Sequence, residues 1–396
     1  MKYLKGKHIL IIVENLPVPF DRRVWQEAST LKENGAEVSI ICPQMKGWTE
    51  SFEVLDGIEI HRHPLPLEAR GALGYLLEYG AAIWYEMKLA RKIYKRKPFQ
   101  VIHGCNPPDL IYLTAKLFKR KGVKYIFDHH DINPELYIAK YDKKDFFYKL
   151  MCYFERQTFK HATASIATNE SYKKLAIDRG KMDSDKIQVV RSGPKLDRFK
   201  LQKPKNKFKK GRKYLVGYLG VIGEQEGIDL LLESAKHICQ EREDVQFAIV
   251  GGGSDLEILK KLSCEMGLEK YVDFYGRVPD QLLLDVLNTA DVCVNPDKPT
   301  EMNNLSTMNK IMEYMALGKP IVQYDLKEGR VSAQTASLYA INNDTKDFAD
   351  KIIFLLNNKK LREEMGLLGY QRVLNDLSWE FESKKLLNFY HKILCN

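Results

Sequence analysis

The chain has 396 residues, which is ample for two domains of ordinary size. Its seven cysteines are an odd number and include no Cys-x-x-Cys pair, which argues against a disulfide framework and a structural zinc site. No apolar run reaches the roughly 18 residues of a membrane span, and the opening MKYLKGKHILIIVEN does not resemble a signal peptide, so we expect a cytoplasmic protein.

The formal net charge of +10 is unevenly distributed. Residues 1–200 hold 35 Lys and Arg against 24 Asp and Glu, and residues 201–213 hold seven basic residues and no acidic one. A basic half can favour an anionic membrane surface, an acidic substrate or nucleic acid. The sequence contains no nucleic-acid-binding motif, so we expect no nucleic-acid partner.

The apolar run of residues 8–13 predicts the first strand of a parallel sheet. No Gly-x-Gly-x-x-Gly follows it, which argues against a nicotinamide or flavin site. Asp21 is suited to cap the next helix, and Arg22 and Arg23 would then lie where doubly wound sheets bind their ligands. The alternative is that one of these arginines pairs with a neighbouring carboxylate.

Strand and helix patterns then alternate, which predicts a parallel sheet with helices on both faces. The expected strands are residues 37–42, 58–61, 101–103, 125–127, 164–168 and 187–190, with a helix over residues 73–95.

That expected helix has an aromatic middle and a basic end. It suits an interfacial membrane helix or, alternatively, a core helix with a solvated basic terminus. The residues concerned are Tyr75, Tyr79, Trp84 and Tyr85, then Lys88, Arg91, Lys92, Lys95, Arg96 and Lys97.

The loop Asp128-His129-His130-Asp131 follows the expected strand 125–127. Four such residues in a row invite a metal-site interpretation, but consecutive side chains point in different directions and rarely share an ion. We therefore expect no metal here.

The basic stretch 201–213 has the composition of an exposed hinge between domains. Beyond it, strands are expected at 214–219, 245–250 and 272–275. Glycine-containing turns follow these strands, and small residues there let a ligand approach the backbone closely.

Residues 291–324 predict a buried strand, a polar loop, a helix and a second buried strand. Ser306 or Thr307 is expected to cap the helix and Gly318 to end it. Lys310 and Glu313 fall on the face opposite the apolar residues. A helix N-terminus, a lysine and a glutamate suit a phosphorylated ligand with hydroxyls, whereas the alternative is a capped surface helix.

The run of residues 309–320, NKIMEYMALGKP, resembles the nucleotide-sugar motif of the retaining glycosyltransferases of family 4. The resemblance implies an α/β fold with two Rossmann-like doubly wound parallel-sheet domains facing a cleft, the B-type glycosyltransferase fold. The implied division is an acceptor-binding domain over 1–200, a linker over 201–213 and a nucleotide-sugar domain over 214–378. A C-terminal helix over 379–396 is expected to cross back to the first domain.

The same resemblance implies roles for individual residues. His130 would approach the transferred sugar beside Asp131, with Asp131 or Asp128 fixing its tautomer, and Lys310 would stabilise the departing diphosphate. The implied donor-binding residues are Gly220, Arg191, Gly276, Arg277, Ser306, Thr307, Met308 and Glu313, with Arg22, Arg23 and Asp131 on the acceptor side. The chain departs from the family at Leu305, Val221 and Glu226, where a glutamate, an arginine and a lysine are usual.

We therefore expect a metal-independent, cofactor-free transferase that moves a sugar with retention from a nucleotide-diphosphate sugar, carried by UDP. The acceptor would be a saccharide or lipid-linked saccharide in surface polysaccharide or glycoconjugate synthesis, reached from the inner face of the cell membrane. Two alternatives remain open at this stage: a non-catalytic partner subunit, and a sugar-nucleotide epimerase on the same fold.

Overall fold

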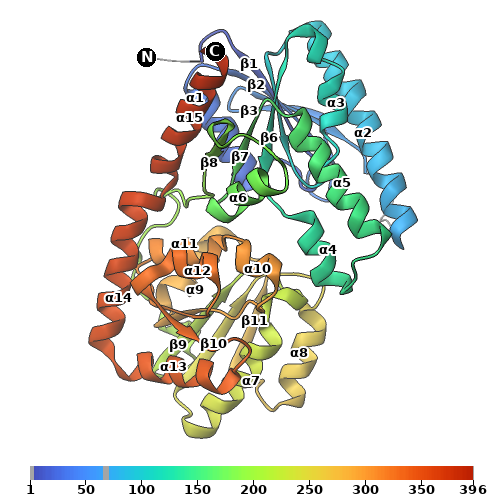
Figure 1. The fold of residues 1–396 in the computed structure, drawn as a ribbon. Helices are drawn as coiled ribbons and strands as arrows, with labels where there is room; N and C mark the ends of the chain where they lie inside the picture. The colour runs from blue at the N-terminus through green and yellow to red at the C-terminus, as the bar shows by residue number, and fades with distance from the viewer. Residues whose placement is uncertain (1–3, 66–70, 396) are drawn as a thin grey trace. The chain divides into compact units, whose positions relative to one another are not determined.

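The computed structural model describes residues 4–65 and 71–395, in which the chain forms two compact units (Figure 1). Unit 1 comprises Met1–Arg191 and Ser383–Asn396, and unit 2 comprises Ser192–Glu382. Each unit is an α/β domain built on its own sheet. The predicted fold class, with two parallel-sheet domains, is confirmed.

The sheet of unit 1 has the buried strand β1 near its centre, where Ile9 lies in register with Val38 and Val101. All pairs are parallel except the edge pair β3 and β4, an antiparallel addition that the sequence pattern did not predict. Across the sheet the strands are β3 (Phe52–Leu55), β4 (Ile58–His63), β2 (Glu37–Pro43), β1 (His8–Val13), β5 (Val101–Cys105), β6 (Lys124–His129), β7 (Ala164–Ala167) and β8 (Ile187–Val189).

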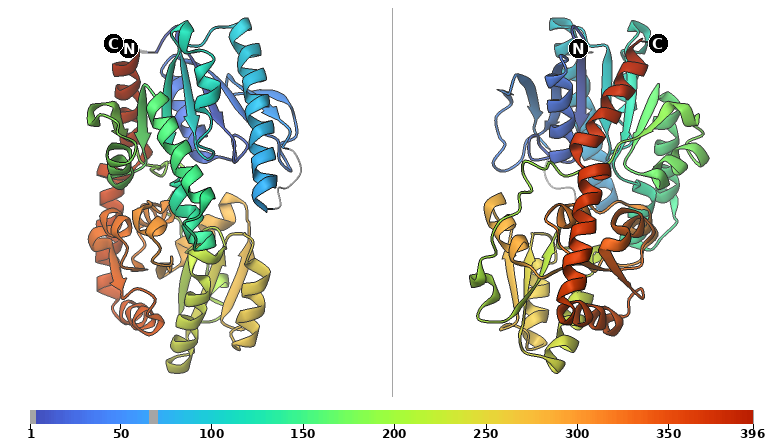
Figure 2. Two further views of the ribbon diagram at one scale, coloured as in Figure 1. Left: turned by 45° about the vertical axis from the view of Figure 1, so that its right-hand side comes forward. Right: turned by 90° about the vertical axis from the view of Figure 1, so that its left-hand side faces the viewer.

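Helices cover both faces of this sheet, as the turned views of Figure 2 show. Helix α1 (Arg22–Glu33) packs on β1 and β2, and the hydroxyl of Tyr390 in α15 (Trp379–Cys395) lies 2.6 Å from His103 Nδ1 on β5. Helices α2 (Gly71–Arg96), α3 (Tyr112–Lys116) and α5 (Phe146–His161) lie side by side on the other face. The remaining helices of unit 1 are α4 (Asn133–Tyr141) and α6 (Glu170–Asp178).

The sheet of unit 2 is parallel throughout its described pairs, and β9 occupies a central position. Its order is β11 (Val272–Gly276), β10 (Val245–Val250), β9 (Tyr214–Leu219), β12 (Val292–Asn295), β13 (Ile321–Tyr324) and β14 (Ser337–Ala340).

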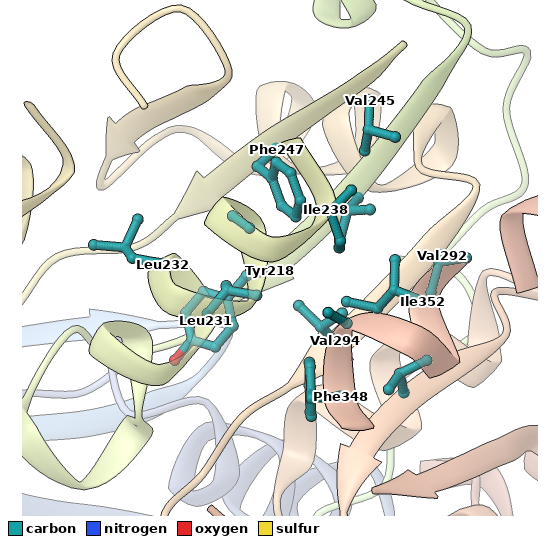
Figure 3. Close-up of a cluster of buried hydrophobic side chains, with 14 of the residues drawn as sticks. Tyr218, Leu231, Leu232, Ile238, Val245, Phe247, Val292, Val294, Phe348 and Ile352 are labelled. Atoms are coloured by element: carbon teal, nitrogen blue, oxygen red, sulfur yellow. The ribbon is translucent and has the colours of Figure 1, made fainter. Parts of the chain in front are cut away.

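Two apolar clusters, one on each face, hold this second sheet. In the cluster of Figure 3, α7 (Ile228–Glu241) and α13 (Thr345–Asn357) present buried side chains to β9, β10 and β12. Each large apolar side chain buried there contributes about 1.5–3 kcal/mol. The other cluster contains α9 (Asp280–Thr289) and α11 (Asn309–Ala316). The other helices are α8 (Leu256–Glu265), α10 (Glu301–Leu305), α12 (Lys327–Ala333) and α14 (Lys359–Arg372).

The start of α11 differs from the prediction. Its N-cap is Met308, with no side-chain hydrogen bond, because a separate short helix, α10, precedes it. The Ser306 hydroxyl donates instead to the carbonyl of Met302 at 2.7 Å. The predicted end is correct: Gly318 has φ +62°, and Lys319 N–H donates to the carbonyl of Tyr314 at 3.0 Å, as in a Schellman motif.

The basic stretch 201–213 is mostly exposed, as its composition predicted, but it belongs to unit 2 and does not lie between the two units. Phe208 within it is 4% exposed. Three of its six lysines pair with carboxylates far along the chain, which composition alone cannot reveal. The pairs are Lys205–Asp285, Lys209–Asp291 and Lys210–Asp273, with N–O distances of 2.6, 2.8 and 2.5 Å. The units divide at residues 191 and 192, before this stretch.

Among the helices described, none combines the length and the apolar character that crossing a bilayer requires.

Two glycine turns of unit 2 pack backbone against backbone. Gly220 N–H donates to Val250 O at 3.1 Å, and Gly251 N–H donates to Gly276 O at 2.9 Å. Gly251 has φ +144°, and a Cβ placed on it would lie 1.7 Å from Gly220 O. The small residues after these strands therefore serve first to let neighbouring loops touch.

This packing predicts that Gly251→Ala destabilises the protein by about 2–5 kcal/mol, from backbone strain together with overpacking. Urea denaturation followed by circular dichroism measures the change. Gly80→Ala is the control, because Gly80 lies in α2, has no heavy atom within 4 Å of a Cβ position and should be neutral or slightly stabilising. Equal stability of the two variants would contradict the assigned role of Gly251.

Candidate functional site

The outward face of α11 brings Lys310 to the carboxyl ends of β9 and β12. Lys310 Nζ lies 2.8 Å from Asp297 Oδ1, just beyond β12, and 3.4 Å from the hydroxyl of Tyr218 on β9. Its Cε lies 3.2 Å from the position a Cβ on Gly220 would take. The amphipathic pattern of the sequence places Lys310 here, because Ile311, Met312 and Met315 are fully buried on the opposite face.

Acidic residues surround this one lysine. Asp297 is 1% exposed, and its Oδ2 has no hydrogen-bond partner within the described part of the chain. Burial raises the pKa of Glu226, the charge of Asp297 adds to the rise, and Lys310 opposes it. Lys310 therefore sits between two carboxyl groups of which one is driven towards its neutral form.

Glu313 lies one turn from Lys310 on the same helix and is partly exposed. The guanidinium of Arg198 approaches it, with Nη1 4.0 Å from Glu313 Oε1. Arg198 also forms two hydrogen bonds to the carboxylate of Asp280, at 2.7 and 3.1 Å. The Glu313 carboxylate is thus steadied by a cation and can still accept from a hydroxyl.

The glycine turns bring two more predicted donor residues to the same sheet edge. Gly276 ends β11 with φ +66°, and the exposed Arg277 follows it. The Cγ of Arg277 would lie 2.9 Å from a Cβ on Gly252, so its side chain runs across the turn after β10. Gly220, Gly276 and Arg277 therefore border one edge of unit 2.

Other predicted donor residues take different positions. Ser306 is engaged with α10, and Met308 packs against the apolar cluster around α9 and α11, so the side chains of both have structural roles. Thr307 is partly buried between the two helices. Arg191 is 8% exposed and ends the first segment of unit 1, whereas the glycine turns belong to unit 2.

In unit 1, His130 lies just beyond β6 and its side chain is 11% exposed. His130 Nε2 is 2.5 Å from Asp128 Oδ2, and Arg23 Nη2 is 2.9 Å from Asp128 Oδ1. Although burial opposes ionisation, Arg23 and His130 hold the pKa of Asp128 well below its usual range. Arg23 Nε–H also donates to His130 Nε2 at 3.0 Å, so Asp128 and Arg23 together fix the orientation of the imidazole ring.

Arg23 is an interior residue that pairs with carboxylates, as the alternative interpretation expected, and its place on the acceptor side stays a prediction. Its guanidinium also lies 3.0 Å from Glu27 and donates to Val190 O at 3.0 Å. Arg22 by contrast is exposed at the start of α1, which Asp21 caps as predicted by accepting from Val24 N–H. Asp131 is half-buried, and burial raises its pKa.

One group of residues in unit 1 has side-chain atoms close enough to share a cation. The possible ligand atoms lie within 4.8 Å of one another and belong to Glu27, Cys105, Asp128 and His130. The guanidinium of Arg23 already supplies positive charge to Glu27 and Asp128. Burial also raises the pKa of Cys105 well above its usual value, which disfavours the thiolate that a metal would need.

Three contributors were missed by sequence reasoning: Tyr218, Asp297 and Arg198. Asp297 follows a buried strand, the one signal that could have indicated it. Tyr218 has the pattern of an ordinary strand residue, and Arg198 lies in a basic connecting stretch. The sequence around them therefore gave no indication that either belongs to the site.

Comparisons with known proteins identify the family of the chain. The family model for the glycosyl transferase 4-like domain matches residues 21–193, and the model for glycosyl transferases group 1 matches residues 213–358. The capsular polysaccharide biosynthesis glycosyltransferase CapM of Staphylococcus aureus is 25% identical over 328 residues, covering 78% of this chain and 80% of CapM.

Solved structures agree on the fold. Sucrose-phosphate synthase from Thermosynechococcus elongatus superposes with a TM-score of 0.80 at 16% identity, over 98% of this chain and 99% of that one. Anabaena HepE, solved in complex with UDP, gives 0.72 at 13% identity, over 98% and 100% of the two chains. The chain therefore belongs to the glycosyltransferases of the B-type fold that resemble family 4.

Proposed function

We propose that this protein transfers a sugar, with retention and without a metal ion, from a nucleoside-diphosphate sugar to a saccharide or lipid-linked saccharide acceptor. The observation that carries the proposal is the juxtaposition of Lys310 and Glu313 on one face of α11, at the sheet edge bordered by the glycine turns. Glu313 would accept from the donor ribose, and Lys310 would meet the diphosphate.

The choice of uridine as the base rests on relatives. HepE was solved with UDP, and the printed function of CapM is capsular polysaccharide biosynthesis. We infer a similar place for this chain in the synthesis of a surface polysaccharide or glycoconjugate.

The chemistry depends on charge placed where the leaving diphosphate develops it. Val221 and Glu226 stand where the resembling family has cations, so Lys310 carries that task, together with backbone N–H groups of the turns. Because Lys310 is already paired with Asp297, it is held in one position before the donor arrives. His130 of unit 1, oriented by Asp128 and Arg23, would contact the transferred sugar.

A non-catalytic partner subunit is the second candidate, favoured by Leu305, Val221 and Glu226. A sugar-nucleotide epimerase is a third, on the fold alone. An isotope-labelled donor separates the three, because it yields transfer, no reaction or isomerisation.

The first test is donor binding. We expect one of uridine, guanosine or adenosine diphosphate, and uridine diphosphate by preference, to raise the melting temperature by about 5 °C or more at 100 times its Kd, because a ligand that binds only the folded state stabilises it by mass action. Differential scanning fluorimetry measures the shift. No shift with any of them at millimolar concentration would instead support the partner-subunit alternative.

Variants localise that binding. Glu313→Gln should weaken nucleotide affinity by about 1–3 kcal/mol, while the exposed Glu301→Gln on α10 serves as its control. Lys310→Gln should lower turnover more than affinity. Lys310→Gln alone leaves the buried Asp297 without its cation and could destabilise the fold. The double variant Lys310→Gln with Asp297→Asn removes both charges, so it tests the loss of the lysine charge without that effect.

The acids around Lys310 predict a pH dependence. A bound diphosphate raises the pKa of Glu226 further, so binding takes up a proton and affinity increases as the pH falls through that raised pKa. Calorimetry with uridine diphosphate in two buffers of different ionisation enthalpy measures the uptake. The nucleotide itself also titrates, so proton uptake on binding is compared between the unchanged protein and Glu226→Gln. The variant should take up fewer protons. Equal uptake by the two proteins would show that Glu226 does not belong to the site.

We also propose that the protein works at the cytoplasmic face of a membrane. In α2 a basic surface formed by Trp84, Lys88, Arg91, Lys92 and Lys95 borders a hollow of about 400 Å³. Lys88 Nζ lies 5.0 Å from the Trp84 ring centroid. Arg96 and Lys97, by contrast, pair with Glu59 and Glu37. Tyr75 lies outside the side chains that the structure describes.

This surface predicts binding to vesicles that contain anionic lipid, weakening with salt, because each exposed cation near such a surface contributes about 1 kcal/mol. Changing Lys88, Arg91, Lys92 and Lys95 to Gln should abolish co-sedimentation. The control removes the same charge from exposed lysines of unit 2: Lys236, Lys261, Lys359 and Lys360. If both quadruple variants sediment alike, the basic surface of α2 is not the attachment site.

A further inference from the structure

Unit 1 contains a cavity of about 500 Å³ that the site described above does not use. Tyr79 of α2, the loop after β5, and helices α4 and α5 form its walls. Its volume lies within the range of sites that bind small molecules. Most of its lining is apolar or aromatic, including Leu136, Tyr137, Phe147, Leu150, Met151 and Phe154.

The polar groups of the cavity differ in how firmly they are held. Asp145 accepts from the Tyr137 hydroxyl at 2.9 Å and from the N–H of Phe147 at 2.9 Å, so it is engaged as the cap of α5. Asp109 accepts from Asn133 at 2.7 Å, and burial raises its pKa to about 6. Lys140 and Lys143 line the cavity from exposed positions. Cations at the rim of an apolar cavity match an amphiphile with an anionic head.

The cavity is joined to the loop that carries His130. Asn106 Nδ2 donates to Asp109 at 2.9 Å, and Asn106 Oδ1 accepts from the N–H of His130 at 2.7 Å and of Asp131 at 3.2 Å. One buried amide thus ties the cavity wall to the backbone of the His130 loop.

We propose that this cavity binds the apolar chain of a phosphate-bearing lipid, with Lys140 and Lys143 meeting the phosphate. Its role as the acceptor's anchor rests on the function proposed above, whereas binding of the lipid does not require donor or turnover. The cavity is also separate from the basic surface of α2. Nine residues separate Tyr79 from Lys88, a rotation of about 180° around the helix.

Farnesyl phosphate is a suitable probe, because it is short, soluble below its micelle concentration and carries both parts of the expected ligand. Isothermal titration calorimetry of the full chain with farnesyl phosphate should show saturable binding. Farnesol should bind about fivefold to twentyfold more weakly, since two exposed charge pairs are lost. Inorganic phosphate at the same concentration should not compete, because it lacks the chain.

Four variants assign the binding to the cavity. Met151→Trp fills the apolar space and should reduce affinity at least tenfold. Lys140→Gln with Lys143→Gln should weaken farnesyl phosphate about tenfold and leave farnesol unchanged. Lys149→Gln, an exposed lysine of α5 that does not line the cavity, should change neither. Leu150→Met, which conserves volume, shows whether any loss with Met151→Trp comes from filling or from misfolding.

Binding that is lost in Met151→Trp and retained in Leu150→Met supports the proposal. Unchanged binding in Met151→Trp, or equal affinities for farnesyl phosphate and farnesol, overturns it, as does an absence of binding by a chain that still melts cooperatively. Uridine diphosphate binding is measured on the same variants. Intact nucleotide binding with no lipid binding rejects this inference alone, whereas the reverse result rejects the donor site and leaves the lipid cavity in place.

Discussion

The parallel direction of the strands is the constraint on which the functional arrangement depends. In unit 2 every described strand pair is parallel, so the ends of β9, β10, β11 and β12 meet at one edge. The turns after these strands are distant in sequence but must share that edge, and those after β9, β10 and β11 fit because their backbones touch at Gly220, Gly251 and Gly276. Lys310 reaches the same edge from α11, whose buried face fixes its rotation. Packing of the core thus determines where the charges lie.

The charge balance around Lys310 explains how one lysine is held in place at the proposed donor site. A desolvated lysine paired with a buried aspartate is held in place without the mobility of a surface side chain. The carboxylate of Asp297 adds negative charge next to Glu226. Burial and this charge raise the pKa of Glu226, which favours its protonated form and limits the negative charge of the site. In unit 1, Arg23 balances the buried charge of Asp128, and the same carboxylate contacts His130 and orients it.

The sequence pattern was sufficient for the parts of the fold that depend on local periodicity. Buried strands such as residues 214–219 and 245–250 have the observed bounds, and the Schellman end of α11 follows from Gly318. Ser306 was wrongly predicted to cap α11. A serine also suits the end of α10, and tertiary packing decides which helix it serves. The composition of residues 201–213 did not indicate that they are held to unit 2, because the acidic partners of their lysines lie about 60 to 80 residues away. Local signals carry no information about such pairs, and Arg198 was missed for the same reason.

The stability cost of the site argues for a working enzyme over a silent partner subunit. Asp297 keeps one carboxylate oxygen without a hydrogen bond in the described chain, and an unsatisfied buried group of this kind costs about 1–3 kcal/mol. Apolar residues in place of such an ion pair are often neutral or stabilising. A protein that uses only its surface has no need for this strained arrangement, whereas an enzyme gains from charges fixed before the substrate binds. The free oxygen of Asp297 and the raised pKa of Glu226 are therefore best explained as the consequence of keeping Lys310 in position for an anionic ligand.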